Sequence, residues 1–510
     1  MTKVLIIGGG LGGLFCGAIL AKEGLKVTVL EKNAAIGGGL QSFTRFGEVF
    51  DTGMHVVGGL QEGGNVRRIL EYLGIWNKVH VQAIPADCAD LLYFAEDKHY
   101  YRIASGKEQF VASLAKDFPS QQDNLTRYVN AMYRLVEEMD LFHLRPSSRD
   151  IFSHSEEFSM AADAFIARYI NDERLQKIVA YVNPLYGGRA NTTPAYIHAT
   201  ISVLHINGLC RFAGGSQMFA ETLGDFIKEH GGEVLASHEV QHIHTEGRNI
   251  TGVTTRKGQH FTADYYISDV HPCSLLTLFD DPKALPKAYR TRLEDIPNTY
   301  SAFLVYLKFK PESFPHLSHT GYYMQSYDGI WDIAEDKHPC SKGFLYMTPP
   351  EIQQGKFARK MIIAAPMNWQ EVARWAEASP TNETEGGRRR SQEYLTWKQE
   401  RANELLSRME EIYPDFRKNI EDINIASPLT IHDYYGVKHG AMFGYAKDCK
   451  NMALSQVPVA TKIPNLLLTG QCVNLHGFCG VPLTAINTCE AILGKNYVIN
   501  KILNQCEYTL

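Results

Sequence analysis

The first thirty residues combine two short apolar runs with a cluster of glycines. Residues 4–7 are Val-Leu-Ile-Ile, residues 14–23 have the composition of an apolar helix, and the six glycines of this region are Gly8, Gly9, Gly10, Gly12, Gly13 and Gly17. Residues 4–21 carry no charge, as in a signal peptide or a membrane span, but the glycines lie where a strand turns sharply into a helix. We therefore predict a buried parallel strand at 3–7 and a helix at 14–23, with no targeting segment.

Strand and helix patterns continue along the chain. We predict a helix at 218–230, strands with intervening turns over 233–269, and a strand at 466–468 followed by a helix that begins near Val481. Residues 76–206 contain a hairpin at 91–103 and helical periodicity over 108–140 and 160–180. Residues 286–459 contain strands at 302–308 and 361–365 and an amphipathic helix at 394–412, with a polar loop at 380–390.

The glycine cluster has the spacing of a dinucleotide-binding turn. Gly8, Gly10 and Gly13 form G-x-G-x-x-G, which also includes Leu11 and Gly12, and a second strand at 26–30 ends in Glu31. Gly8 permits the turn, Gly10 lets the backbone approach a pyrophosphate, and Gly13 allows the helix to pack closely. Because Glu31 can accept hydrogen bonds from ribose hydroxyls and repels a 2′-phosphate, we expect FAD or NAD rather than NADP.

Composition narrows the range of functions. The chain has 510 residues, and its 51 Lys and Arg against 56 Asp and Glu give a net charge of −5, so we expect no nucleic-acid partner. The 10 cysteines are scattered without a CxxC pair, which predicts reduced thiols, no metal site and a cytoplasmic protein. Peripheral contact with a membrane surface stays open, and the sequence does not specify an oligomeric state.

The segment after Glu31 resembles the flavoprotein amine oxidase and carotenoid desaturase superfamily. Residues 32–40 (KNAAIGGGL) contain the Gly-Gly turn that passes along the pyrophosphate there, and residues 50–58 (FDTGMHVVG) resemble the FDTG-x-H-x-x-G stretch of retinol saturases. The resemblance implies FAD and adds Lys32, Gly38, Gly39 and Leu40 to its contacts. Most members have Arg where this chain has Gly39 or Leu40, so that charged phosphate contact is missing or supplied elsewhere.

The carboxy-terminal region resembles the last flavin motif of the same superfamily. Residues 463–471 (IPNLLLTGQ) and 480–485 (GVPLTA) carry the likeness, which implies cofactor contacts at Gly470, Gln471, Gly480, Val481, Pro482 and Leu483. Independently of the resemblance, the positive end of a helix near Val481 would stabilise reduced flavin. Retinol saturases have Asp after the Gln, whereas this chain has Cys472, so the usual acid for a ribityl hydroxyl is absent there.

These motifs together predict an α/β fold. We expect a Rossmann-like FAD-binding domain of the glutathione reductase type, discontinuous in sequence, formed by residues 1–75, 207–285 and 460–510. Residues 76–206 and 286–459 would form an inserted α+β substrate domain. By the resemblance, the strand that contains Val240 runs beside the adenine.

The resemblance also implies the reaction. It implies hydride transfer between flavin N5 and a carbon of an apolar isoprenoid or polyene, as in a saturase or a desaturase. His55, in the FDTG stretch, is our candidate for delivering a proton or orienting the substrate, and Tyr435 is a second candidate. Each can equally be a hydrogen-bonded core residue. No second G-x-G-x-x-G is present, so nothing marks a separate NAD(P) site; the electron partner stays open, with NAD(P)H as an external donor among the alternatives.

Three alternatives share parts of this pattern. A flavin amine oxidase and a redox-neutral carotenoid isomerase use the same cofactor motifs. Non-catalytic escort proteins for prenylated GTPases resemble the fold without binding flavin, and their glycine fingerprint is typically eroded. The intact Gly8, Gly10, Gly13 and Glu31 argue against an escort protein.

Overall fold

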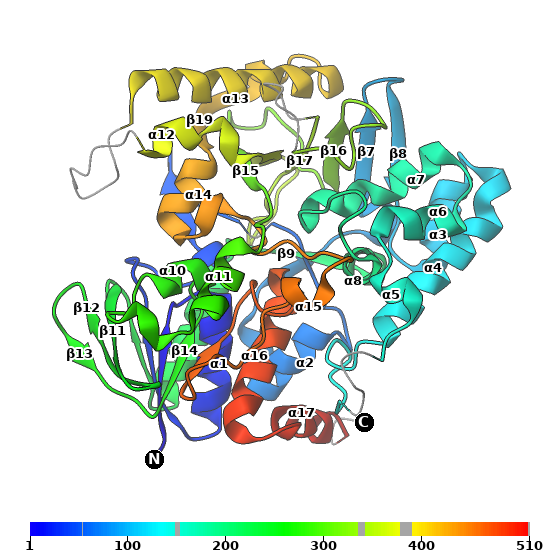
Figure 1. Ribbon diagram of the computed structural model, residues 1–510. Coiled ribbons are helices and arrows are strands. Elements are labelled where there is room, and N and C mark those ends of the chain that lie inside the picture. The colour runs from blue at the N-terminus through cyan, green and yellow to red at the C-terminus, as the bar shows by residue number, and fades with distance from the viewer. Residues whose placement is uncertain (54, 148–152, 335–341, 378–389, 508–510) are drawn as a thin grey trace.

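The computed structural model describes residues 1–53, 55–147, 153–334, 342–377 and 390–507. A parallel five-stranded sheet forms the core of the lower half of the molecule in Figure 1, with the strand order β10-β2-β1-β14-β20. Its strands are β1 (Lys3–Ile7), β2 (Lys26–Leu30), β10 (Glu233–Leu235), β14 (Tyr265–Ser268) and β20 (Leu466–Leu468). The sheet therefore joins three segments that are far apart in the sequence.

Helices cover this sheet and pack on one another. They are α1 (Leu11–Lys22), α2 (Asn65–Leu73), α9 (Gln217–Glu229), α16 (Gly477–Leu493) and α17 (Tyr497–Glu507). Helices α1 and α16, from opposite ends of the chain, lie side by side (Figure 1). Residues 12–21 of α1 are all buried because α1 packs against several elements, and a Cβ at Gly17 would lie only 2.7 Å from Ile227 of α9.

Two helix starts differ from the predictions. Helix α1 begins at Leu11 rather than at residue 14, because Gly12 and Gly13 form its first turn. Helix α16 begins at Gly477 rather than near Val481, with His476 as its N-cap residue and Pro482 inside the helix. Pro482 lies inside the helix rather than in its first turn, where proline is common.

Smaller sheets flank the parallel one. Strands β11 (Val240–Glu246), β12 (Asn249–Thr255) and β13 (His260–Phe261) form an antiparallel sheet, and β3 (Ser42–Arg45) pairs with β4 (Glu48–Asp51). Strands β5 (Val57–Gly58), β6 (Val81–Ala83) and β9 (Leu209–Phe212) form a third small sheet. Helices α10 (Pro272–Leu276) and α11 (Lys287–Asp295) follow β14.

The upper half of Figure 1 contains a seven-stranded sheet of order β19-β15-β18-β17-β16-β7-β8, antiparallel except for the β16–β7 pair. Its strands are β7 (Asp90–Phe94), β8 (His99–Ile103), β15 (Ser301–Phe309), β16 (Thr320–Met324), β17 (Gly343–Met347), β18 (Lys360–Met367) and β19 (Ile420–Ala426). Both predicted insertions thus contribute strands to one sheet. Helix α13 (Gln392–Ile412) covers one face through Ala402, Leu405, Leu406 and Met409.

The remaining helices gather mainly beside this sheet (Figure 1). They are α3 (Lys107–Ala115), α4 (Gln122–Glu137), α5 (Glu156–Ser159), α6 (Ala162–Tyr169), α7 (Glu173–Val179), α8 (Ala195–Asn207), α12 (Ala373–Glu377), α14 (Pro428–Tyr435) and α15 (Met452–Ser455). The continuous helices predicted over 108–140 and 160–180 are each broken. Pro119 starts a separate 3₁₀ turn before α4, and Asp172 caps α7 by accepting from the Leu175 amide at 2.8 Å.

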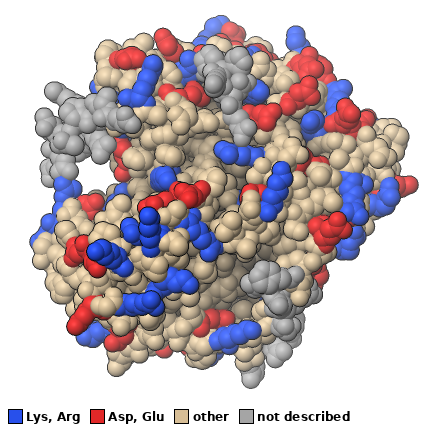
Figure 2. Space-filling model, in the orientation of Figure 1, with Lys and Arg blue, Asp and Glu red and all other residues tan. Residues whose placement is uncertain are grey.

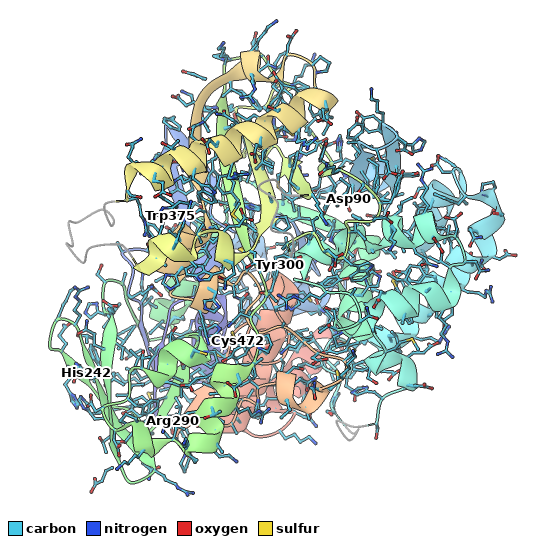
Figure 3. The ribbon with its side chains drawn as sticks, turned by 45° about the horizontal axis from the view of Figure 1, so that its top comes forward. Asp90, His242, Arg290, Tyr300, Trp375 and Cys472 are labelled. Carbon is cyan, nitrogen blue, oxygen red and sulfur yellow. The ribbon has the colours of Figure 1, made fainter. Side chains whose placement is uncertain are left out.

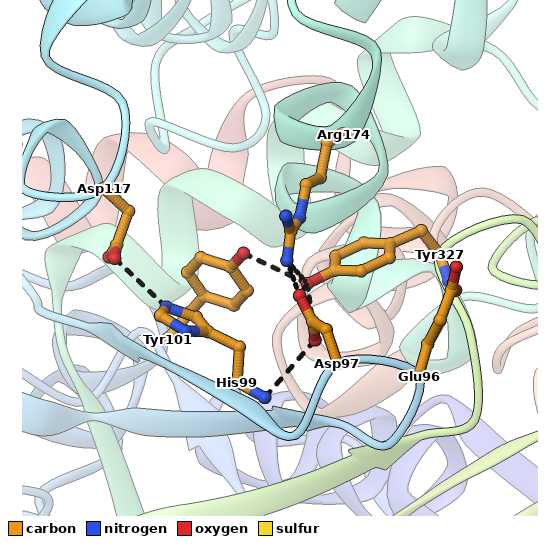
Figure 4. A network of polar contacts seen from close by, with 7 residues as sticks. All are labelled: Glu96, Asp97, His99, Tyr101, Asp117, Arg174 and Tyr327. Carbon is orange, nitrogen blue, oxygen red and sulfur yellow. Dashed lines mark hydrogen bonds and ion pairs between the residues drawn. The ribbon is translucent and has the colours of Figure 1, made fainter.

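A polar network joins the tip of the β7–β8 hairpin to this group of helices (Figure 4). Asp97 at the tip forms an ion pair with Arg174 of α7, and the Arg174 guanidinium lies 4.4 Å from the ring centroid of Tyr327. The Tyr327 ring stacks on Phe94 of β7 with the centroids 4.0 Å apart. The network fixes one outer corner of the upper half.

The surface mixes charges of both signs. Lys and Arg are interspersed with Asp and Glu on the face shown in Figure 2. Among the helices of the described ranges, none has the length and apolar character to cross a bilayer. Of the predicted polar loop 380–390, residues 380–389 lie outside the described residues.

Candidate cofactor and active site

A cavity of about 910 Å³ is lined by residues of both halves, near the upper end of the roughly 300–1,000 Å³ range of ligand sites. Most of the predicted cofactor residues line it: Gly8, Gly10, Leu11, Gly12, Glu31, Lys32, Gly38, Gly39, Leu40, Val240, Gly470, Gln471, Gly480 and Val481. Both candidate catalytic residues, His55 and Tyr435, line it as well. Gly13, Pro482 and Leu483 do not, because they are buried within helices α1 and α16.

The glycine turn between β1 and α1 has the geometry of a phosphate-binding loop. Gly8 has φ +103°, a backbone conformation that favours glycine, and its amide donates to the Leu30 carbonyl at 2.9 Å. A Cβ at Gly13 would overlap the Gly8 carbonyl oxygen, so Gly13 serves the packing of the turn. The first amides of α1 have no partner within the helix and attract an anion.

Glu31 lies at the end of β2 with its carboxylate held by two backbone amides. Its Oε2 accepts from Gly9 and its Oε1 from Asn33, each at 2.8 Å. Burial raises the pKa of Glu31, and the two amides counteract that rise. The remaining lone pairs of the carboxylate are available to two ribose hydroxyls.

Three carboxyl groups line the described cavity, at Glu31, Glu239 and Asp269, while Lys32 is its one Lys or Arg. The Lys32 ammonium donates to the Asp433 carbonyl at 3.4 Å, and burial lowers the pKa of Lys32. Leu40 is fully buried in the short 3₁₀ turn Gly38–Leu40. Apart from Lys32, no cation of the described lining takes the place of the arginine that is absent near Gly39.

Asp269 follows β14 and was assigned no role from the sequence. The backbone amides of Gly10 and Gly13 hydrogen-bond to its carboxyl group, and burial raises the pKa of Asp269 to about 7. Its position carried a usable signal, because ligands of parallel α/β sheets bind at the carboxyl ends of the strands.

The carboxy-terminal motif closes the same end of the cavity. Gly470, after β20, has φ +87°, and a Cβ there would overlap the Asp269 carboxyl group. Burial raises the pKa of Cys472 to about 12, so this thiol stays neutral and does not replace the missing acid. Figure 3 shows Cys472 and Tyr300, both cavity residues, toward the centre of the molecule.

His55 and Tyr435 differ in what they offer chemically. Burial lowers the pKa of His55 to about 4, with Asp51 opposing and Arg211 adding to that shift. The buried Nε2 of His55 has no hydrogen-bond partner among the described residues. Tyr435 donates to the Thr52 hydroxyl at 2.7 Å, and burial raises its pKa to about 12. His55 is thus a neutral imidazole with a free nitrogen, whereas Tyr435 anchors the FDTG segment.

A buried polar cluster lies at the substrate side. Asp90, at the start of β7, accepts from the Tyr181 hydroxyl at 2.7 Å and lies 3.1 Å from His205 Nδ1. His205 lines the cavity, and Arg211 nearby donates to the Leu317 carbonyl and the Thr320 hydroxyl. The surrounding lining is largely apolar: Leu185, Ile197, Ile201, Leu204, Leu209, Met324, Phe344, Leu345 and Met347. Sequence reasoning missed this cluster because its members come from separate segments without a shared motif.

These features fit a flavin dinucleotide. The turn at Gly8, the ribose-binding Glu31 and the bare backbone at Gly470 converge on one cavity, which continues into an apolar chamber. No group of three or more His, Cys, Asp or Glu side chains in the described residues has the geometry of a metal site.

Comparisons with known proteins agree with this fit. A model of the family of flavin containing amine oxidoreductases matches residues 11–493. The all-trans-retinol 13,14-reductase of Macaca fascicularis is 25% identical over 97% of this chain and 86% of its own length. The 4,4′-diapophytoene desaturase (4,4′-diapolycopene-forming) of Methylomonas sp is 24% identical over 66% of each chain. The solved structure of cyclohexylamine oxidase from Brevibacterium oxydans IH-35A, 15% identical, covers 99% of both chains with a TM-score of 0.60.

Proposed function

This chain belongs to the family of flavin containing amine oxidoreductases and is an FAD-dependent enzyme, and on that premise we propose that it saturates a carbon–carbon double bond of an apolar polyene. The observation that carries the proposal is the apolar chamber that adjoins the cofactor residues in one cavity. Such a lining suits a hydrocarbon chain and offers little to an ammonium group. The retinol reductase relative, matched along nearly the whole chain, supports saturation as the direction.

The glycine turn, Glu31 and the backbone at Gly470 would hold FAD, which in its reduced form would supply the hydride for one carbon of the double bond. The neighbouring carbon then needs a proton. His55 faces the cavity with a neutral imidazole, so we assign it the task of holding the exchanged proton at a ring nitrogen. The apolar side chains exclude water and align the substrate chain. NAD(P)H is the proposed external source of electrons.

The test is anaerobic incubation of the purified, reduced holoprotein with polyenes, followed by mass spectrometry. A product heavier by two hydrogens, with matching reoxidation of the flavin absorbance, supports saturation. A product of unchanged mass would indicate a redox-neutral isomerase instead. Peroxide released from the oxidised holoprotein and polyamines in air would indicate an amine oxidase, and either result would overturn the proposal.

A further inference from the structure

Asp269 occupies the place where the two glycine turns of the cofactor site meet. Its Oδ2 lies 2.5 Å from the position that a Cβ would take at Gly10, and its Oδ1 lies 2.5 Å from that position at Gly12. A Cβ at Gly470 would overlap Oδ1 as well. The amides of Gly10 and Gly13, at the amino end of α1, hydrogen-bond to the carboxyl group. An acidic side chain therefore lies where helix amides would otherwise face only the cofactor's phosphates.

The described lining of the cavity around Asp269 contains more Asp and Glu than Lys and Arg side chains. Glu31, Glu239 and Asp269 face Lys32 alone among the Lys and Arg of the described lining. The diphosphate of FAD adds further negative charge beside Asp269. In a water-poor site, an ionised carboxylate next to a phosphate is strongly unfavourable. One of these groups has to be neutral when the cofactor is bound.

We propose that Asp269 is a cofactor ligand that binds FAD as the uncharged carboxylic acid, with its O–H donating to a phosphate oxygen, so that FAD binding is linked to proton uptake. The acid accepts from a backbone amide on one side and donates to the phosphate on the other. This role also compensates for the arginine that the Gly-Gly turn lacks, because a neutral donor replaces a charged one. The proposal rests on FAD binding and is independent of the substrate.

The surroundings of Asp269 favour the acid. Burial is the largest cause that raises the pKa of Asp269 to about 7, and Glu31 at the end of β2 raises it further, against the two amides. Cys472, after β20, is a neutral thiol, and Lys447 lies beside it. On the segment that follows Asp269, His271 Nε2 donates to the Asn298 Oδ1 at 2.8 Å. Of these groups, only Lys447 carries a positive charge, and because burial lowers its pKa to about 8 it does so mainly below that pH; it interacts with Cys472.

The affinity for FAD should fall as the pH rises above about 7. Below about pH 7 the free protein already carries the proton on Asp269, so the FAD dissociation constant is constant. Above that pH the carboxylate has to take up a proton for each FAD bound. The dissociation constant then rises by about tenfold for each pH unit.

Equilibrium dialysis of the holoprotein at pH 6, 7, 8 and 9, with retained FAD read from its absorbance, measures this slope. We expect the wild type to bind about 50-fold more weakly at pH 9 than at pH 7, because Asp269 is already half ionised at pH 7. Asp269→Asn, which keeps a neutral donor, should bind with the same affinity at both pH values. The control Glu239→Gln removes a carboxylate from the same cavity and should keep the wild-type slope. A constant wild-type affinity, or an unchanged slope in Asp269→Asn, overturns the proposal.

Infrared spectroscopy of the wild-type holoprotein provides a test that needs no folded variant. With aspartate carboxyl carbons labelled with ¹³C, a protonated aspartic acid shows an isotope-shifted carbonyl band at pH 8, separate from carboxylate bands. We expect this band in the FAD complex, and its loss on removal of FAD at that pH. Its absence from the complex overturns the proposal, whatever the substrate of the enzyme proves to be.

Discussion

His55 shows how the surroundings of one residue set its chemistry. An exposed imidazole has a pKa near 6.5 and changes charge close to neutral pH. Burial lowers the pKa of His55 to about 4, so the ring is neutral throughout the physiological range. It can accept a proton or donate from its one N–H, but it does not store a proton as the imidazolium ion before turnover.

We predict that His55→Gln retains FAD but lowers turnover of a reducible polyene by about 10²–10⁴, the usual range for a positioned acid–base group. Because His55 titrates near pH 4 in the protein, its own ionisation should give no inflection of kcat/KM near pH 6.5. Stopped-flow reoxidation of the reduced protein measures both quantities. His80→Gln, at an exposed position, is the matched control. An unchanged rate in His55→Gln would show that His55 takes no part in the chemistry.

At this scale the sequence predicted the residues whose spacing is local. Gly8, Gly10, Gly13 and Glu31 act within one βαβ unit, so their order along the chain reports their geometry. The contact between Asp90 and His205 joins residues 115 positions apart, and no pattern in the sequence encodes it. The prediction of Gly13 as a cofactor contact marked a residue that shapes the turn without lining the cavity.

Single elements show a contrast between buried and exposed polar pairs. Strand β7 begins with Asp90, which is fully buried, and the hairpin it forms with β8 ends in Asp97, whose side chain is 33% exposed in its pair with Arg174. The Asp90 carboxylate accepts two hydrogen bonds and balances the buried Arg211 guanidinium. Loss of its charge leaves that guanidinium uncompensated in a medium of low dielectric constant.

We predict that Asp90→Asn lowers the free energy of unfolding by on the order of 3 kcal/mol. Asp97→Asn, at the tip of the hairpin and partly exposed, should cost at most about 1 kcal/mol. Urea unfolding of the two variants, followed by circular dichroism, compares them directly. An equal loss of unfolding free energy in the two variants would contradict the prediction that burial makes Asp90 the more important of the two.

Element types were more predictable than element ends. Strands β1 and β2 were found because buried β-branched runs are distinctive, and α13 was found from its periodicity. The ends of helices depend on prolines and capping residues, which hydrophobic periodicity does not reveal. Pro119 and Asp172 interrupt apolar patterns that continue across them, and α16 already begins at Gly477, with His476 as its N-cap residue.

The whole molecule depends on its last fifty residues. Strand β20 pairs with β14 in register Tyr266 with Leu466, and α16 packs along α1 over the interior of the sheet. Leu466 and Ile486 are fully buried in these contacts. Removal of this segment would expose the edge of the sheet and one side of α1 together.

We predict that a chain truncated before Ile463 neither folds nor binds FAD, because it would leave a large apolar surface of the first domain uncovered. Expression of residues 1–462, followed by size-exclusion chromatography and flavin absorbance, is the measurement. Truncation after Glu507 is the control, since the residues that build the sheet and α16 remain. A soluble, yellow 1–462 fragment would show that the last strand and helix are an appendage.

The order of strands in the parallel sheet has a consequence for biosynthesis. The strand order β10-β2-β1-β14-β20 requires residues 466–468 as its last member, so the sheet cannot be completed until these residues have been synthesised. The glycine turn emerges first, but the segment that closes over the flavin emerges last. The glycine turn and Gly470 therefore come together at the cavity only after residues 466–470 have been synthesised.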